Sequence, residues 1–388
     1  FLKSHPTIPR FFHEQHYLCR GMGKLHHGPP LDMSHFPEPY YGGEKGTASY
    51  VLPSNQDKKP PTECADVADE AYRDGQLAAE AVKTIRRWKD SGRSWCLGLG
   101  FHKPHLPFAA PKRYWDLYDR DGIELSPGPE LPDNVPFYAP ATFELPTYDG
   151  KLGTKDNPID DDQARLLRHG YFACTSFVDA QIGKVLKALD ESGQRDRTVI
   201  CFWSDHGWHL GDNGCWGKHT NFEWATRSPL IIDAPSLPAG SRGRASEALV
   251  EYVDMFPTLC DLTGCTKPDY LEGLSMMPLL QSPSRPWKTA AFSQYERWGN
   301  NPVLMGRSMR TDRYRYTEWQ RTENCVNNDN DFWHGPAGSV HGRELYDHKT
   351  DPGESVNLAM KPEKQQVVQA LSKKLEAGWR GAAPGHAR

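Results

Sequence analysis

The sequence TVICFWSDHGWHLGDNGCWGK, residues 198–218, decides the predicted fold. Its first six residues are a β-branched and aromatic run, typical of a strand buried on both faces. Asp205 and His206 follow, at the carboxyl end of the strand, where open α/β folds build their sites. Both are metal-ligand residue types, although a bare Asp-His-Gly triplet fits a hydrogen-bonded turn equally well. The glycine-rich loop beyond them can pass close to a ligand, and Lys218 at its end offers a positive charge to an oxyanion.

Length and composition allow one large domain and a smaller one. The chain has 388 residues, of which 37% are hydrophobic, and a net charge of -4. This charge argues against a general nucleic-acid binder, and no apolar run approaches the about 20 residues that cross a bilayer. Nine cysteines are dispersed without a Cys-x-x-Cys pair, which fits neither a zinc ribbon nor a disulfide-dense scaffold. The chain begins at Phe1 without an initiator Met or a signal peptide, which suggests a fragment or a processed product.

A second strand is also followed by titratable side chains. Residues 95–101 have the pattern of another buried strand, and His102, Lys103 and His105 come directly after it. A packed histidine with no chemical role would explain His105 alone. Convergence with other titratable groups on one sheet edge would instead favour a site.

Near the N-terminus, a short glycine-bounded element carries Lys24 and His27. On its own this element fits a solvated turn. Residues 28–63 are rich in Pro, Gly and charge and predict a long surface excursion.

The order of the predicted elements indicates an α/β domain followed by a smaller α+β domain. The first domain alternates helices and strands around a mostly parallel sheet, with helices at 66–88, 163–192 and 253–262 and strands at 95–101, 198–203 and 228–232. The second has a small antiparallel sheet and a terminal helix, with strands at 290–295, 303–311, 314–319 and 343–347 and the helix at 363–379. The predicted domains are therefore residues 1–285 and 286–388.

The motifs together resemble the sulfatase family, and they occur in the family's order from residue 8 to residue 379. They are Gly23-Lys24-x-x-His27, His102-Lys103-Pro104-His105-x-Pro107, Ser204-Asp205-His206-Gly207-Trp208 with Lys218, and Leu345-Tyr346-Asp347 with Asp351-Pro352 and Asn357-Leu358. Each motif alone would be weak evidence. The resemblance implies an alkaline-phosphatase-like fold, in which helices sandwich a mostly parallel central sheet.

The resemblance also implies a site that hydrolyses sulfuric esters. Its residues would be Lys24, His27, His105 and Lys218 as catalytic groups, Asp205 and His206 as metal ligands, and Trp208, Trp216 and His102 as substrate contacts. The metal is usually calcium in this family, although the imidazole keeps another divalent cation possible. His27 would take a proton when the covalent sulfate is expelled, while His105 and Lys218 would grip the sulfate and assist the leaving alcohol.

The members most similar to this sequence imply a sulfated saccharide substrate, with sulfate on the 2-hydroxyl of a uronic acid. Neither a nucleic-acid partner nor a membrane span is expected. The family also implies a secreted, periplasmic or lysosomal protein.

One departure concerns the nucleophile. The family uses a formylglycine, installed by a formylglycine-generating enzyme in a Cys/Ser-x-Pro-x-Arg motif, and two further aspartate ligands. Neither is in this sequence, because the nearest string, at 281–285, has Gln in the nucleophile position. Both are expected upstream of Phe1, so the chain as written is expected to be inactive and to bind its metal poorly.

Two alternatives from other classes stay open. A metal-dependent phosphatase or phosphodiesterase of the same superfamily would need further His and Asp ligands for a second metal. A catalytically dead carbohydrate-binding homologue would keep the fold, together with Trp208 and Trp216. A nucleophile motif in the genomic sequence upstream of Phe1 would favour the enzyme.

Overall fold

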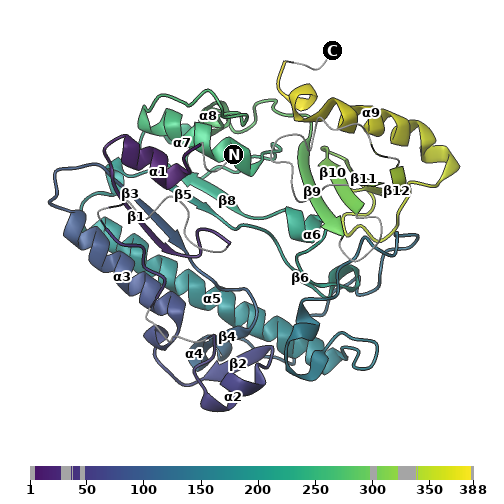
Figure 1. Cartoon of the computed structure of the whole chain (residues 1–388), viewed down its shortest axis with the longest axis horizontal. Helices are drawn as coiled ribbons and strands as arrows, with labels where there is room; N and C mark the ends of the chain where they lie inside the picture. Colours follow the sequence, from purple (N-terminus) through teal and green to yellow (C-terminus); the bar gives the residue numbers. More distant parts are fainter. Residues whose placement is uncertain are drawn as a thin grey trace. The chain divides into compact units, whose positions relative to one another are not determined.

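The computed structural model describes residues 5–27, 36, 38–43, 49–297, 304–321, 338 and 340–385 (Figure 1). Packing divides the chain into two compact units. The first comprises residues 1–125 and 143–198, and the second comprises residues 126–142 and 199–388. The domain boundary between residues 285 and 286 stays a prediction.

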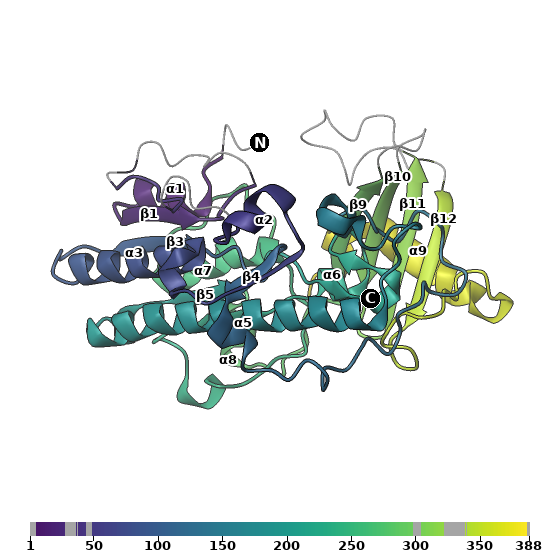
Figure 2. The same cartoon turned by 90° about the horizontal axis from the view of Figure 1, so that it is seen from below.

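The first unit contains two pairs of parallel strands. β1 (Leu18–Gly23) pairs with β3 (Trp95–Gly100), and β2 (Thr62–Ala65) pairs with β4 (Phe108–Pro111). Its helices are α1 (Ile8–Glu14), α2 (Pro53–Lys58), α3 (Arg73–Trp88), α4 (Lys112–Trp115) and α5 (Asp161–Glu191). The two long helices, α3 and α5, run side by side (Figure 2). β1, β3 and α3 share an apolar cluster that contains Met22, Leu77, Ala81, Leu97 and Leu99.

The two long predicted helices of this unit are confirmed, with shifted starts. α5 begins two residues before the predicted start because Asp160 and Gln163 form a capping box, in which each side chain accepts a hydrogen bond from the backbone amide of the other. α3 begins at Arg73, because residues 69–71 form a separate 3₁₀ turn. A Cβ at Gly75 would overlap the carbonyl oxygen of Asp69, so only glycine allows this turn to pack so closely on α3.

The second unit contains the strand with which residues 198–218 begin. β5 (Ile200–Trp203) pairs with β8 (Leu230–Asp233) in antiparallel orientation, and β6 (His209–Leu210) forms a short pair with β7 (Trp216–Gly217). The prediction that β5 is buried on both faces is wrong, since Phe202 is 36% and Trp203 40% exposed. Within the described residues β8 is the one strand that pairs with β5. The helices that follow are α6 (Glu223–Thr226), α7 (Met255–Thr263) and α8 (Met277–Gln281).

The C-terminal part of this unit confirms the predicted antiparallel sheet and helix. The strands are β9 (Ala291–Arg297), β10 (Leu304–Arg310), β11 (Tyr314–Arg321) and β12 (Val340–Asp347), in the spatial order β12-β11-β10-β9. α9 (Gln365–Ala382) lies along one face of the sheet (Figure 1). Its buried residues Val368, Leu371 and Leu375 share one hydrophobic cluster with Met309, Tyr316 and Leu345 of the strands.

The turn after β12 also holds the glycine-rich loop of residues 211–217. The Asn213 side-chain amide donates to the carbonyl oxygens of Gly353 (2.9 Å) and Glu354 (3.2 Å). The Glu354 carboxylate accepts the backbone N–H of Glu223 at 2.8 Å and the guanidinium of Arg315 at 2.6 Å. Residues distant in sequence therefore fix the backbone on both sides of Lys218.

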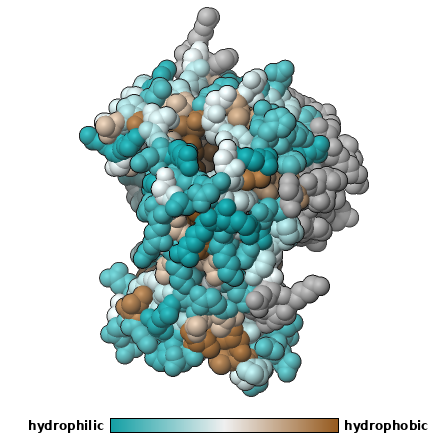
Figure 3. All heavy atoms as spheres, turned by 90° about the vertical axis from the view of Figure 1, so that its left-hand side faces the viewer, coloured by the Kyte–Doolittle hydropathy of each residue, from teal (hydrophilic) through white to brown (hydrophobic). Residues whose placement is uncertain are grey.

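The face in Figure 3 is mostly hydrophilic, with apolar residues gathered in a few small areas. In the described part of the chain, no helix combines the length and hydropathy that crossing a bilayer requires. The cysteines at the described positions are all free thiols.

Candidate functional site

Glycines at the carboxyl ends of β1 and β3 bring two of the predicted motifs together. The strands are parallel and in register, with Gly23 opposite Gly100. Gly23 has a φ of 68°, and a Cβ at this position would overlap the carbonyl oxygen of Gly100. The Lys24 amide donates to that same oxygen at 2.7 Å. Lys24 and the loop that begins at His102 therefore leave the same end of the strand pair.

The two members of the first motif differ in exposure. Lys24 is half-buried, whereas His27 is exposed at the edge of the described residues. Their predicted catalytic roles stay predictions.

The loop at residues 102–107 is held by a buried carboxylate. Asp74, in the first turn of α3, accepts the backbone N–H of His102 at 3.0 Å and that of Lys103 at 2.8 Å. The His102 ring lies between Asp74, whose Oδ1 is 3.4 Å from Nδ1, and Arg73, whose Nη1 is 3.4 Å from Nε2. The Lys103 ammonium donates to the carbonyl oxygen of Pro107 at 2.5 Å, so this lysine closes the loop.

Both nitrogens of the His105 ring face oxygen atoms. Nδ1 is 2.8 Å from the carbonyl oxygen of Leu106, and Nε2 is 3.0 Å from Oε1 of Glu144. Both contacts are hydrogen bonds only when both nitrogens carry protons. A doubly protonated imidazole can hold an anion or give a proton to a leaving alkoxide.

In the second unit, Asp205 and His206 lie beyond β5 as predicted. Their Oδ1 and Nε2 atoms are 3.5 Å apart, and the Asp205 side chain is 58% exposed. His206 Nδ1 is 2.7 Å from the carbonyl oxygen of Gly207, which leaves Nε2 as the nitrogen for a ligand. Two ligands of one cation, with bonds of about 2.0–2.6 Å, can adopt this spacing. The pair therefore fits two positions of a divalent-cation site.

Trp208 supports Lys218. The Lys218 ammonium lies 5.0 Å from the centre of the Trp208 ring, within range of a cation–π interaction, and the ring is only 8% exposed. Trp216 is half-buried on β7, opposite Leu210 in the β6–β7 pair. The sugar contacts expected of Trp208 and Trp216, and that of His102, stay predictions.

Another histidine of this stretch is fully buried. His209 is 0% exposed, with Nδ1 3.0 Å from the carbonyl oxygen of Asp212 and Nε2 2.8 Å from the Thr220 hydroxyl. Burial lowers the pKa of His209 to about 4. The ring is therefore neutral at neutral pH and holds the loop from inside.

One cluster of three side chains in the described part of the chain has donor atoms close enough for a metal: Glu223, His348 and Glu354. Arginine guanidinium groups already neutralise the negative charge of the two glutamates in this cluster. Arg315 bonds to both glutamates, and Arg310 donates to Glu223 at 3.2 Å. Burial acts to raise the pKa of Glu223, but Arg315 and Arg310 hold it below its ordinary value. The cluster fits a buried ion-pair network better than a calcium site.

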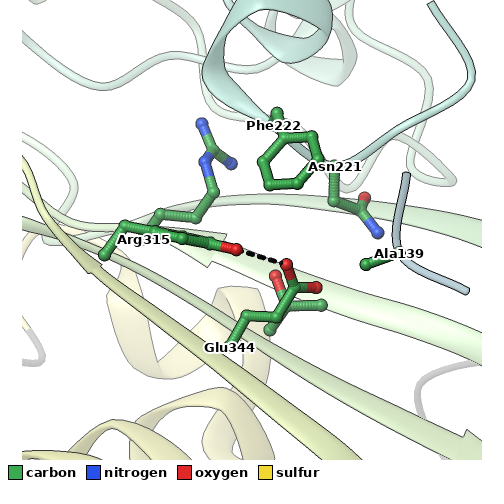
Figure 4. A pocket seen from close by; sticks show the side chains of 7 residues that line it. Ala139, Asn221, Phe222, Arg315 and Glu344 are labelled. Atoms are coloured by element: carbon green, nitrogen blue, oxygen red, sulfur yellow. Dashed lines mark hydrogen bonds between the residues drawn. The ribbon is translucent and has the colours of Figure 1, made fainter. Parts of the chain in front are cut away.

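A small pocket lies above the C-terminal sheet (Figure 4). Its lining includes Asn221, Phe222, Arg315, Glu344 and Tyr346. Burial raises the pKa of Glu344 to about 7. The Trp319 indole and the Tyr346 hydroxyl each donate to the Glu344 carboxylate at 2.7 Å.

Sequence reasoning missed Asp74, Glu144 and His209. An acidic residue in the first turn of a helix is common for reasons of the helix dipole alone, so Asp74 carried no distinctive signal. Glu144 lies in an irregular segment, and no sequence pattern around it indicates a contact with the loop at residues 102–107. His209 lies further along the same stretch as His206, and no spacing in the sequence distinguishes it as a buried residue.

The fold defines the class of the protein, which is alkaline-phosphatase-like. Residues 2–265 match the sulfatase family model, and residues 211–380 match the model for the C-terminal region of N-sulphoglucosamine sulphohydrolase. The chain belongs to the sulfatase family, whose members hydrolyse sulfuric esters.

Curated relatives and solved structures agree with this assignment. The chain is 32% identical to iduronate 2-sulfatase of Mus musculus and of Homo sapiens, and each match covers 91% of this chain and 76% of the relative. A phosphonate monoester hydrolase from Silicibacter pomeroyi has a TM-score of 0.74 at 22% identity, covering 98% of this chain and 81% of its own. A protein solved with its substrate D-glucosamine-2-N,6-O-disulfate has a TM-score of 0.71 at 19% identity, covering 97% and 84%. The predicted alkaline-phosphatase-like fold is confirmed.

Proposed function

We propose that this protein removes sulfate from sulfated sugars, with the 2-O-sulfate of a uronic acid as its preferred group. The observation that carries the proposal is the 32% identity to iduronate 2-sulfatase along 91% of the chain. The strand-end placement of the basic groups supports it. A sulfated saccharide would be the substrate, and an exported or lysosomal location would suit it.

The basic side chains would act on the charge of the sulfate ester. During S–O cleavage, negative charge moves toward the bridging oxygen, so preorganised cations stabilise the transition state more than the ground state. Lys24 and Lys218 would hold the non-bridging oxygens, with Lys218 steadied on the Trp208 ring at 5.0 Å. His105 would grip a sulfate oxygen and assist the departure of the leaving alcohol, and His27 would take a proton when the enzyme-bound sulfate is released.

Asp205 and His206 would hold a divalent cation, and we propose calcium. The cation, when bound, would act as a Lewis acid on a sulfate oxygen. A calcium ion takes about 6–8 oxygen ligands, so residues besides Asp205 and His206 must complete the shell. We further propose a formylglycine nucleophile, matured by a formylglycine-generating enzyme, at a position outside this sequence.

The test is to assay the full-length protein on 2-O-sulfated uronides, on 6-O-sulfated glucosamine and on phosphate esters. The 2-O-sulfated uronides should be turned over fastest, and Asp205→Asn should abolish turnover together with the response to added calcium. A clear preference for phosphate esters would assign a phosphatase instead. Tight saccharide binding without turnover by any variant would identify a carbohydrate-binding homologue.

A further inference from the structure

We propose that Asp74 is a positioning residue for the predicted active-site loop at residues 102–107. Its carboxylate anchors the backbone where the loop leaves β3 and thereby sets the place of the His105 imidazole. This role rests on the proposed function, because His105 is the group that would meet the sulfate ester.

The contacts of Asp74 go to the loop. Its Oδ1 lies 3.0 Å from the His102 amide nitrogen, and its Oδ2 lies 3.1 Å from the same nitrogen and 2.8 Å from that of Lys103. The residue is only 2% exposed, so water competes little for these bonds. Two successive N–H groups directed at one buried carboxylate form a strong, charge-assisted contact with a defined geometry.

Helix capping does not explain this carboxylate. Acidic residues in a first turn usually serve their own helix, but no side chain caps α3 at its N-cap residue, Tyr72. The close packing at Gly75 instead fixes the start of α3 against the 3₁₀ turn at residues 69–71. From this position the Asp74 carboxylate reaches the backbone amides of His102 and Lys103.

The loop transmits this anchoring to His105. The His105 amide donates to the carbonyl oxygen of His102 at 3.1 Å, and Lys103 closes the loop onto Pro107 at 2.5 Å. His105 is thus joined by one hydrogen-bonded turn to the residues that Asp74 holds. A displacement of the backbone at His102 would move the imidazole, and small misplacements of a catalytic group are costly.

Asp69 provides a matched control. It is also a buried carboxylate beside the start of α3, and it accepts hydrogen bonds from Lys184 at 2.8 Å and Gln181 at 2.9 Å. It has no hydrogen bond to residues 102–107 among those of the described chain. Asp69→Asn should therefore reduce stability without loosening the loop.

The experiment compares Asp74→Asn and Asp69→Asn in the full-length protein. Asp74→Asn should lower kcat on a 2-O-sulfated uronide by about 100-fold with little change in KM, because substrate still binds but the His105 imidazole is misplaced. In the same variant, amide hydrogen exchange at His102 and Lys103 should become faster, and the His105 ring ¹⁵N signals should shift. Asp69→Asn should leave the kcat, the exchange of these amides and the ring signals unchanged.

Several results would overturn the proposal. Equal losses of kcat in the two variants would reduce Asp74 to a general structural role, and an unchanged kcat with a loosened loop would show that the anchoring has no catalytic consequence. If Asp74→Asn does not fold, exchange in the wild-type protein decides, since His102 and Lys103 amides that exchange freely cannot be held by a carboxylate. Absence of any sulfatase activity would refute the proposed function, whereas the exchange data would still test the anchoring itself.

Discussion

Replacing Glu344 with Gln should change how the stability of the protein depends on pH. Glu344 is a buried carboxyl on β12 and lines the pocket in Figure 4. Burial raises its pKa from the ordinary 4.5 to about 7, while the Trp319 and Tyr346 donors and the charge of Arg297 act in the opposite direction and the charge of Glu354 adds to the rise.

The direction and the size of the pH effect of Glu344 on stability follow from the linkage between proton binding and folding. The folded protein keeps the Glu344 proton between pH 4.5 and about 7, where the unfolded chain has lost it. This group therefore contributes stability that is fully present below pH 4.5 and is lost as pH rises through about 7. The difference between the two pKa values corresponds to about 3 kcal/mol.

Glutamine cannot ionise, so this loss should be absent from Glu344→Gln. At pH 4.5 the variant should be less stable than the wild type by about 1–3 kcal/mol, because an amide can accept from one of the two donors but not from both. This deficit should shrink as pH rises to about 7, because only the wild type then loses stability. Denaturant unfolding of both proteins between pH 4.5 and 8.5 measures the two effects separately. Curves that stay parallel across this range would show that Glu344 does not titrate in the folded protein, and the reasoning from its burial would be refuted.

Two further predictions concern the stretch at residues 198–218. Lys218→Ala should raise the barrier of sulfate ester hydrolysis by about 2–4 kcal/mol, as for a lost oxyanion donor. It should reduce stability by only about 1–2 kcal/mol, the value of a cation–π contact with a largely buried ring. Steady-state kinetics and thermal unfolding measure the two effects, and an unchanged rate would show that Lys218 does not contact the sulfate. His209 has a lowered pKa of about 4 against an ordinary 6.5, so its stabilising contribution is present above pH 6.5 and is lost as pH falls through about 4, by about 3 kcal/mol. His209→Gln should remove this acid-side loss, and unfolding curves that still fall as steeply as those of the wild type would count against it.

The sequence predicted the C-terminal part well, because turn residues separate its short strands and the apolar residues of α9 recur at helical spacing. It missed β2 and β4, which have only four residues each. Strands this short show no measurable periodicity of hydrophobic residues. They form because each pairs in parallel with a strand distant in sequence, which a local pattern does not reveal. The prediction that β5 is buried on both faces failed for a related reason. An apolar run of residues indicates a strand, but it does not show how many other elements pack against that strand.

For the site, the sequence located the groups at strand ends but not the residues that hold them. Asp205, His206 and His105 stand directly after strands, so their placement followed from strand prediction. Asp74 and Glu144 contact the loop at residues 102–107 only because tertiary packing brings them there, and a local sequence pattern cannot predict such contacts. The burial of Trp208 was equally beyond prediction, because it depends on the folded protein, in which the ring is 8% exposed and the Lys218 ammonium lies 5.0 Å from its centre.

The hydrogen bonds of Asn213 have a consequence for the biosynthesis of the protein. Its side chain finds its acceptors at Gly353 and Glu354, and the amide of Glu223 finds its acceptor at Glu354. During translation the glycine-rich loop therefore cannot form these hydrogen bonds until residue 354, more than 130 positions later, has emerged from the ribosome. Until then the stretch that carries Lys218 lacks these partners. A premature stop before residue 353 would therefore leave the loop without them, even though every residue of the loop had been translated.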